Sequence, residues 1–248
     1  MPAVFVHGVP ETPAVWDALR SHLHRDDVIA LQLPGFGCPR PDGFAATKEA
    51  YVAWLVRELD QIGGQGPIDL VGHDWGGGFV LRLVSTRADL VRSWVSDIAG
   101  MGDVDFAWHE VAKVWQTPGA GEDFFKATFA QSPEERGALY AAMFSVPLDA
   151  AVALNRGIDE TMAGCILDLY RSAVDVGIEW APAFRDIPKP GCILLAADDP
   201  LLSHDLARRA TKRAGATLTE LDGVSHWWML QDPARSAAAI EAFWATLA

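Results

Sequence analysis

The stretch GHDWGG at residues 72–77 follows the apolar run 68–71 and precedes a helix-like stretch at 78–84. This order predicts a strand, a tight turn and a helix, with the side chain of Asp74 at the apex of the turn. Glycines on both sides of the apex permit a strained backbone and close packing of the helix on the strand. In the commoner form of this elbow the apex is serine. A carboxylate there favours displacement at a saturated carbon, with an ester formed on Asp74 itself.

Composition sets the outer bounds of the prediction. The chain has 248 residues, half of them hydrophobic, which is enough for a large core in one elaborated domain or two lobes. The net charge of −13 disfavours nucleic acid and anionic membranes as partners. The N-terminal residues include neither a basic region nor a long apolar segment, so we expect no signal peptide and no membrane anchor.

Cysteine and metal-ligand patterns point to a protein without cofactors. Cys38, Cys165 and Cys192 are odd in number and widely spaced, which indicates neither a disulfide framework nor a zinc site. A reducing cytoplasm fits this usage. The sequence has no clustered metal ligands and no dinucleotide loop, and the glycines at 76–78 lack the lysine of a phosphate-binding loop. We therefore expect no metal and no cofactor.

Short β-like runs alternate with helical patterns in the first third of the chain, which indicates a parallel sheet with crossover helices. The predicted strands there are 3–6, 28–31, 68–71 and 93–96. Thr12 is predicted to cap the first helix, with Pro13 at its first position. A helix at 47–62 is predicted to end at Gly63-Gly64, because glycine adopts the left-handed conformation that closes a helix.

From about residue 100 to residue 185, helical periodicity with Pro, Gly and Asp breaks replaces the β-like runs. The alternation then resumes with strands 192–196 and 217–221 and with helices that Ser203 and Asp232 begin. We therefore predict an α/β fold in which residues 1–99 and 187–248 form a core domain. Residues 100–186 form a helical cap inserted in that core.

Three further segments converge on the chemistry of Asp74. The turn HGVPE at 7–11 follows the first strand and can direct the amide of Val9 towards an oxyanion, beside the amide of Trp75. Asp199 follows the strand 192–196, at the carboxyl edge where sites of open α/β folds gather. His226 lies on the loop after the last strand. The chain order of nucleophile, acid and histidine predicts a catalytic triad.

The identity of the triad acid stays open at this point. Asp198 is adjacent to Asp199, and only one of the two can point at His226. Asp97, at the end of the strand 93–96, is another candidate. We prefer Asp199 and expect Asp97 to be a structural carboxylate.

With these motifs the sequence resembles the α/β-hydrolase superfamily, and within it the epoxide hydrolases, over nearly its whole length. Segments QTPGAGE at 116–122 and LYR at 169–171 look like the cap motifs of that family. The resemblance implies a helical cap over the sheet and a cis peptide bond before Pro10. Because the H-G turn arrives at residue 7, we expect about six mainly parallel strands flanked by helices, without the usual N-terminal hairpin.

The resemblance also implies a mechanism. Asp74 attacks an epoxide carbon, and a water activated by His226 hydrolyses the resulting ester while Asp199 orients the histidine. The family usually provides two cap tyrosines that bind the epoxide oxygen. Tyr170 matches the second of these, but the first falls near Val111, which cannot donate a hydrogen bond. His109 lies close by and is a possible second donor.

Two other functions stay as alternatives. Haloalkane dehalogenases use the same ester chemistry, but commonly place an asparagine where this chain has Val9; fluoroacetate dehalogenases resemble this elbow with an arginine where it has Trp75. Because this chain has neither the asparagine nor the arginine, the sequence favours epoxide opening over haloalkane or haloacid dehalogenation. A non-catalytic hydrolase-fold receptor is the remaining alternative, because fold alone does not prove activity.

Aromatic residues gather near the segments that should face the cleft. We expect Trp108, Trp115, Tyr140 and Trp227 to contact the substrate, which predicts an apolar small molecule, with aromatic compounds among the candidates. The expected partners are this small molecule and water. Neither nucleic acid nor a membrane is expected as a partner.

Overall fold

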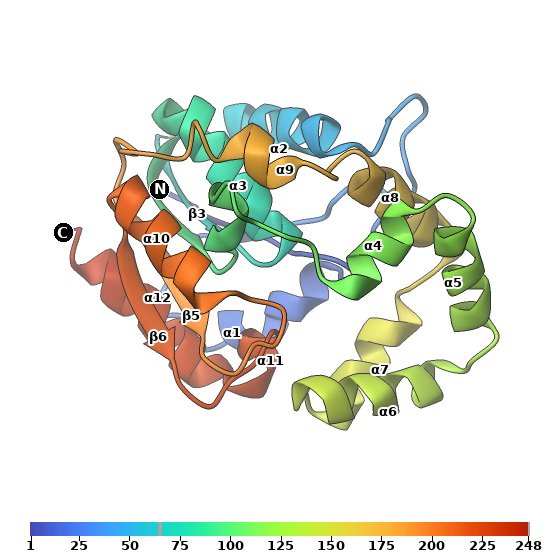
Figure 1. The fold of residues 1–248 in the computed structure, drawn as a ribbon. Coiled ribbons are helices and arrows are strands. Elements are labelled where there is room, and N and C mark those ends of the chain that lie inside the picture. Colours follow the sequence, from blue (N-terminus) through green and yellow to red (C-terminus); the bar gives the residue numbers. More distant parts are fainter. Residues whose placement is uncertain (64–65, 248) are drawn as a thin grey trace.

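A computed structural model describes residues 1–63 and 66–247 and contains a six-stranded sheet in the order β2-β1-β3-β4-β5-β6 (Figure 1). Every neighbouring pair of strands is parallel. The strands are β1 (Ala3–Val6), β2 (Val28–Leu31), β3 (Ile68–Gly72), β4 (Val91–Ser96), β5 (Gly191–Ala196) and β6 (Thr217–Leu221). The predicted fold class and number of strands are confirmed; β4 and β5 begin slightly earlier than the sequence suggested.

Helices cover both faces of the sheet because its central strands are apolar on both sides. In β1, Val4 and Val6 pack into one hydrophobic cluster, and Ala3 and Phe5 pack into the other. The first cluster contains the helices α2 (Lys48–Ile62), α3 (Trp75–Thr86) and α10 (His204–Ala214). The second contains α1 (Asp17–Arg20), α11 (Trp228–Gln231) and α12 (Pro233–Ala245). These layers hold the carboxyl edge of the sheet rigid.

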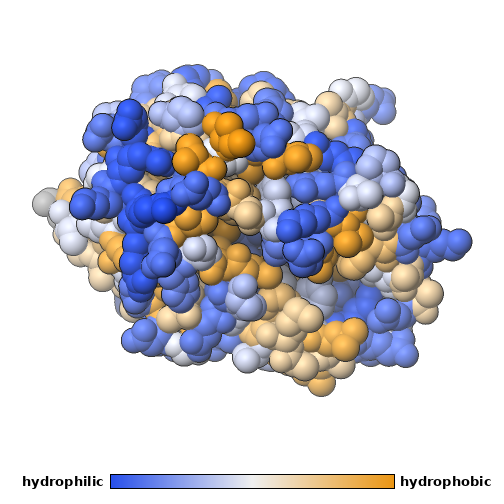
Figure 2. Space-filling model, in the orientation of Figure 1, coloured by the Kyte–Doolittle hydropathy of each residue, from blue (hydrophilic) through white to orange (hydrophobic). Residues whose placement is uncertain are grey.

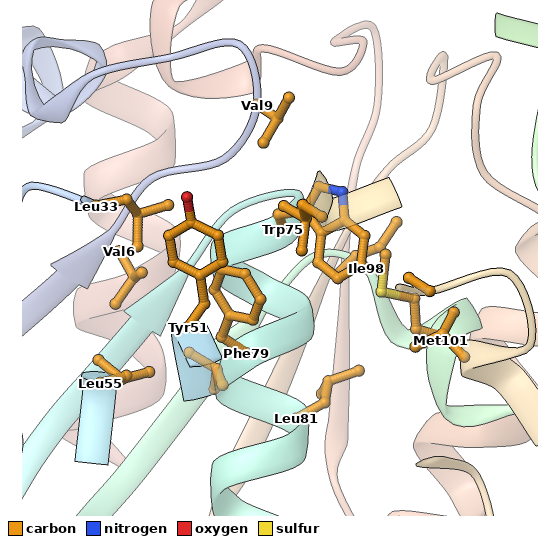
Figure 3. Close-up of a cluster of buried hydrophobic side chains, with 14 of the residues drawn as sticks. Val6, Val9, Leu33, Tyr51, Leu55, Trp75, Phe79, Leu81, Ile98 and Met101 are labelled. Carbon is orange, nitrogen blue, oxygen red and sulfur yellow. The ribbon is translucent and has the colours of Figure 1, made fainter. Parts of the chain in front are cut away.

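Aromatic packing in the first cluster extends to the start of α3. The ring of Tyr51 on α2 stacks on Phe79 of α3, with ring centroids 5.4 Å apart (Figure 3). Phe79 in turn lies 5.4 Å from the ring of Trp75, at the start of the same helix. The helix that follows the elbow is thereby packed from its first residue.

A helical insert follows β4 and precedes β5. It consists of α4 (Glu110–Gln116), α5 (Ala120–Phe129), α6 (Pro133–Phe144), α7 (Leu148–Arg156) and α8 (Glu160–Arg171), which lie to the right of the sheet in Figure 1. The short helix α9 (Val176–Trp180) returns to the core, where the Trp180 ring packs edge-on against Trp75. The predicted division into core and cap domains stays a prediction. Within the described residues, no helix is long and apolar enough to cross a membrane.

The predicted helix ends have mixed outcomes. Ser203 and Asp232 cap α10 and α12 through their side chains, as expected. Thr12 is the N-cap residue with Pro13 at the first helical position, as predicted, but the element is a 3-10 helix, Pro13–Trp16, and the Thr12 side chain makes no capping bond. Gly63 ends α2 with φ −70°, in the right-handed region instead of the left-handed one. Gly64 lies outside the described residues.

Candidate active site

The elbow between β3 and α3 holds Asp74 in a strained conformation. Its φ of 48° and ψ of −123° lie where a non-glycine residue rarely occurs. Gly76 permits this approach, because a Cβ there would lie 2.2 Å from the carbonyl oxygen of Val6. A Cβ on Gly8 would lie 2.4 Å from the Cβ of Asp74. The two glycines thus bring the elbow, the first strand and its turn into direct contact.

The carboxylate of Asp74 sits against the turn after β1. The backbone N–H of Val9 donates to Oδ1 of Asp74 at 2.8 Å, and the Val9–Pro10 peptide bond is cis, as the resemblance implied. Burial raises the pKa of Asp74 to about 6, against the charges of His226 and His73 and a hydrogen bond from the amide of Trp75. Both amides named from the sequence therefore act on this one carboxylate.

His226 lies between two carboxylates. Its Nδ1 is 2.8 Å from Oδ2 of Asp199, and its Nε2 is 3.9 Å from Oδ2 of Asp74. Burial lowers the pKa of His226, but the charge of Asp199 and its hydrogen bond outweigh this and hold it above 6.5. Burial likewise raises the pKa of Asp199, yet His226 holds it below its ordinary value. An Nδ1–H donated to Asp199 leaves Nε2 as the basic nitrogen that faces Asp74.

The structure separates the three candidate acids. Asp199 is buried and bonded to His226, whereas Asp198 is exposed and its backbone amide donates to Val224. Asp97 is bonded elsewhere, to the ring of His73, to Nε1 of Trp228 at 2.7 Å and to the backbone amide of Asp74 at 3.0 Å. Only Asp199 of the three contacts His226.

A buried charged cluster beneath the elbow was not anticipated from the sequence. The ring of His73 lies between Asp97 and Glu11, with Nε2 2.9 Å from Oε1 of Glu11. Burial lowers the pKa of His73, but the two carboxylates raise it well above 6.5. The other Glu11 oxygen accepts the amide of Gly8 at 2.8 Å. This imidazolium thus links the elbow to the turn that carries Val9.

An apolar cavity of about 400 Å³ opens above Asp74 and His226. Of the expected substrate contacts, Trp115, Tyr140 and Trp227 line it. Trp108 instead lines a small adjoining pocket, and its indole N–H donates to the carbonyl of Ala173 at 2.8 Å. Exposed apolar side chains lie at the rim: Val111 on α4, and Leu139 and Met143 on α6. Figure 2 shows patches of hydrophobic surface among hydrophilic residues on this face of the molecule.

Tyr170 reaches this cavity from α8. Its ring packs against Trp75, Trp108 and Trp115 at centroid distances of 5.5, 5.1 and 4.8 Å. Burial, followed by the charge of Asp74, raises the pKa of Tyr170 well above 10. The phenol is therefore neutral at ordinary pH and able to donate its proton.

His109 lies at the start of α4, where the sequence placed a possible second donor. Its Nδ1 accepts the backbone N–H of Ala112 at 3.2 Å and caps the helix. Burial, and then the charge of His226, lowers its pKa. A neutral ring whose Nδ1 is an acceptor carries its proton on Nε2, so this side chain offers one N–H to the cavity that it lines.

No group of three or more potential metal ligands occurs among residues 1–63 and 66–247. Asp74, Val9, Asp199 and His226 meet at the carboxyl edge of the sheet, because each follows one of its strands. Such an edge is where open α/β sheets bind ligands.

Solved structures with this fold span several activities. An epoxide hydrolase, VrEH1 from Vigna radiata, superposes with a TM-score of 0.77 at 17% identity, over 99% of this chain and 91% of that one. Epoxide hydrolase A from Mycobacterium thermoresistibile gives 0.74 at 22% identity, over 98% and 90%. The haloalkane dehalogenase DbeA from Bradyrhizobium elkani gives 0.73 at 19%, over 99% and 91%. At these identities the likeness concerns the fold alone.

Sequence comparison with curated proteins gives two relatives. Lipase LipV of Mycobacterium tuberculosis is 36% identical over 90 residues, which are 36% of this chain and 34% of the lipase. The (E)-2-((N-methylformamido)methylene)succinate hydrolase of Acinetobacter baylyi is 21% identical over 98% of this chain and 89% of that enzyme. The profile of the alpha/beta hydrolase family matches residues 3–239. The chain therefore belongs to the α/β-hydrolase family.

Proposed function

We propose that this protein is an epoxide hydrolase that converts an apolar epoxide to a vicinal diol through an ester on Asp74. One arrangement carries the proposal: a single cavity is lined by the Asp74 carboxylate, by the base His226 and by two neutral proton donors, Tyr170 and His109. Ester-cleaving enzymes of this fold use serine at the elbow, so a carboxylate supports attack at a saturated carbon.

In the first step, Oδ2 of Asp74 attacks an epoxide carbon, and the carbon–oxygen bond opens with its electron pair on the epoxide oxygen. That oxygen takes a proton from the Tyr170 hydroxyl, with the N–H of His109 as a second donor. The other carboxylate oxygen, Oδ1, stays on the amide of Val9, 2.8 Å away. This oxygen becomes the carbonyl oxygen of the ester.

In the second step, water attacks the Cγ carbon of Asp74. His226 takes a proton from this water at Nε2, while Asp199 stabilises the imidazolium. Negative charge develops on Oδ1, where the amides of Val9 and Trp75 stabilise it. Collapse of the intermediate breaks the bond to the product oxygen, which takes the proton back from His226. This leaves Asp74 as a carboxylic acid and Tyr170 as a phenolate. The diol leaves, and the proton passes from Asp74 through water to Tyr170, which restores the carboxylate and the phenol.

The donors on the cavity wall favour an epoxide over a halide. An opening epoxide needs a proton, which Tyr170 and His109 supply, whereas a departing halide needs only N–H groups directed at it. The indole of Trp75 is fully buried and does not line the cavity. Val9 has no side-chain donor.

Haloalkane dehalogenation stays the second candidate, on one observation. The indole N–H groups of Trp75 and Trp115 have no hydrogen-bond partner among the described residues. Both rings contact Tyr170, and Trp115 lines the cavity. A halide held by the indole N–H of Trp115 is therefore the main chemical alternative.

A single-turnover experiment separates the candidates. Excess enzyme is incubated with styrene oxide in isotopically labelled water, and the label is located by mass spectrometry of the Asp74 peptide. Diol formation with label in Asp74 is the expected result. Bromide release from bromoalkanes without diol formation overturns the proposal in favour of dehalogenation. No ester with any epoxide or haloalkane, even when His226 is replaced by Gln, favours a non-catalytic receptor.

A further inference from the structure

Arg136 on α6 lines the same cavity and is buried, with 7% of its surface exposed. One of its N–H groups, on Nη2, donates to the backbone carbonyl of Asn155 at 2.7 Å. Its Nε and Nη1 atoms have no hydrogen-bond partner, and no carboxylate of the described residues lies within 4.0 Å of it. A guanidinium carries five N–H donors, so four are unused here.

Such a side chain is unusual in an apolar wall. A buried cation is costly unless it is paired, and its unused donors add a further cost. Nη2 uses one of its two N–H bonds, so its second N–H is unused, whereas Nε and Nη1 each have less than 1 Å² of accessible surface. A charge-assisted hydrogen bond from this N–H suits a carboxylate oxygen.

A line of side chains on α6 relates Arg136 to the catalytic base. Arg136, Tyr140 and Phe144 are spaced four residues apart, so they lie along one face of the helix. The ring of Phe144 is 6.1 Å from that of His226, and the ring of Tyr140 is 5.4 Å from that of Trp227. At 1.5 Å per residue, Arg136 lies about 12 Å along the axis from Phe144. It therefore marks the end of the cavity away from the chemistry.

A second polar group lies at the same end. Asn155 on α7 lines the cavity and is 1% exposed, and its Oδ1 atom has no hydrogen-bond partner within the described part of the chain. Its amide nitrogen donates to the carbonyl of Ala151 at 2.9 Å. The wall between this end and Asp74 is apolar, with Phe125, Ile158 and Ile166 among its members.

We propose that the substrate carries a carboxylate, which Arg136 binds at the far end of the cavity, while the reacting carbon lies at Asp74. An apolar chain that spans on the order of 10 Å joins the two ends. The identity of the reacting carbon as an epoxide rests on the proposed function; the carboxylate site does not. The net charge of −13 gives no general attraction for anions, so the selectivity comes from this side chain.

Inert probes test the anion site without any reaction. Binding of octanoate and octanamide is measured by calorimetry with the unchanged protein and with Arg136→Met, Arg136→Lys and Arg156→Met. Arg156 is the matched control, because it is exposed on α7 and pairs with Glu134 at 2.6 Å. A series of carboxylates from butanoate to dodecanoate then finds the preferred chain length.

We expect octanoate to bind at least about tenfold more tightly than octanamide to the unchanged protein, which corresponds to about 1.4 kcal/mol. Arg136→Met abolishes this preference, Arg136→Lys retains part of it, and Arg156→Met leaves it intact. Equal binding of acid and amide by the unchanged protein overturns the proposal. So does a preference that persists in Arg136→Met. Because the first comparison needs no variant, it holds even if a substitution prevents folding.

Turnover then distinguishes this proposal from the function on which it rests. A long-chain epoxy acid and its amide are compared with the unchanged protein; a lower KM for the acid at similar kcat is expected. If no epoxide reacts but the octanoate preference holds, the proposed reaction is wrong and the carboxylate site stands. If epoxides react with equal KM for acid and amide and the octanoate preference is absent, the reaction stands and the carboxylate site is wrong.

Discussion

The Nε2 atom of His226 lies 3.9 Å from Oδ2 of Asp74, beyond hydrogen-bond distance. A histidine bonded directly to the nucleophile would hold the oxygen that must attack. At this separation the carboxylate keeps a free oxygen, and the histidine remains available to a water that approaches Cγ.

Replacement of His226 by Gln is expected to trap the ester. Glutamine cannot take a proton from water, so Asp74 is alkylated but the ester is not hydrolysed. We expect turnover to fall by about 10²–10⁴. Intact-protein mass spectrometry should show the protein with one added epoxide. The double variant with Asp74→Asn should show no added mass, and an adduct in that control would mean that another residue is alkylated.

The two chemical steps should depend differently on pH. Attack needs the Asp74 carboxylate, whose pKa is raised to about 6, so alkylation slows as the pH falls through this value. Hydrolysis needs neutral His226, whose pKa is raised above 6.5. As the pH falls, hydrolysis should therefore begin to slow at a higher pH than alkylation does. Ester formation removes the Asp74 charge that helps to raise this pKa, so His226 should titrate lower in the ester. Single-turnover tryptophan fluorescence measures both rates; alkylation independent of pH from about 5 to about 8 would contradict the assignment.

Charge-neutral variants should identify the triad acid. Asp199→Asn leaves His226 without the partner that orients it, and ester hydrolysis should slow by about 10³–10⁴. Asp198→Asn is the matched control: its side chain is exposed, so the rate should stay within about a factor of two. The rate of ester decay is the measurement. Equal loss in both variants would argue that the local charge matters more than the hydrogen bond.

Asp97→Asn should affect stability before chemistry. The variant leaves His73 with one carboxylate instead of two and weakens the bond to the amide of Asp74. Breaking such a buried pair costs about 3–5 kcal/mol of the free energy of unfolding, which urea denaturation measures. Ester hydrolysis by the folded fraction should exceed that of Asp199→Asn. An Asp97→Asn protein with an unchanged free energy of unfolding would show that the pairing of His73 with Asp97 does not stabilise the fold.

Tyr170 and His109 should affect the rate of alkylation alone. Tyr170→Phe removes the hydroxyl that protonates the opening epoxide, and we expect alkylation to slow by about 10²–10³ with hydrolysis unchanged. His109→Asn keeps an oxygen that can cap α4 but removes the ring N–H from the cavity, so a smaller loss is expected without loss of helix stability. Rapid-quench measurement of ester formation tests both. A Tyr170→Phe enzyme with normal alkylation would assign the proton to His109 or to water.

Local patterns were sufficient to predict the elbow, the six strands and the loops that bring Asp74, Asp199 and His226 to one edge of the sheet. The strained turn at Asp74 and the glycines around it are properties of adjacent residues, and the loops after parallel strands meet at one edge. The choice between Asp199 and Asp97 was harder, because both follow neighbouring strands, β4 and β5. Only the directions of their side chains separate them, and the sequence does not contain these directions.

The sequence did not predict the groups that are buried by packing between segments far apart in the chain. His73 is paired with Glu11 and Asp97, residues from three separate segments, and no local spacing relates them. Arg136 follows two glutamates at the start of a helix, which is typical of a solvated face. It is buried because α7 packs against α6 and Arg136 bonds to a carbonyl of that second helix.

The helical insert connects β4 to β5, which are adjacent in the sheet. The insert is therefore attached to the core at two neighbouring strands, and it contributes no strand to the sheet. Replacement of α6 and α7 by the corresponding segment of another family member should leave Asp74, Asp199 and His226 in place. Members of the family can thus acquire new substrates by exchanging this insert. The reaction is then inherited with the sheet and its loops, and the specificity with the insert.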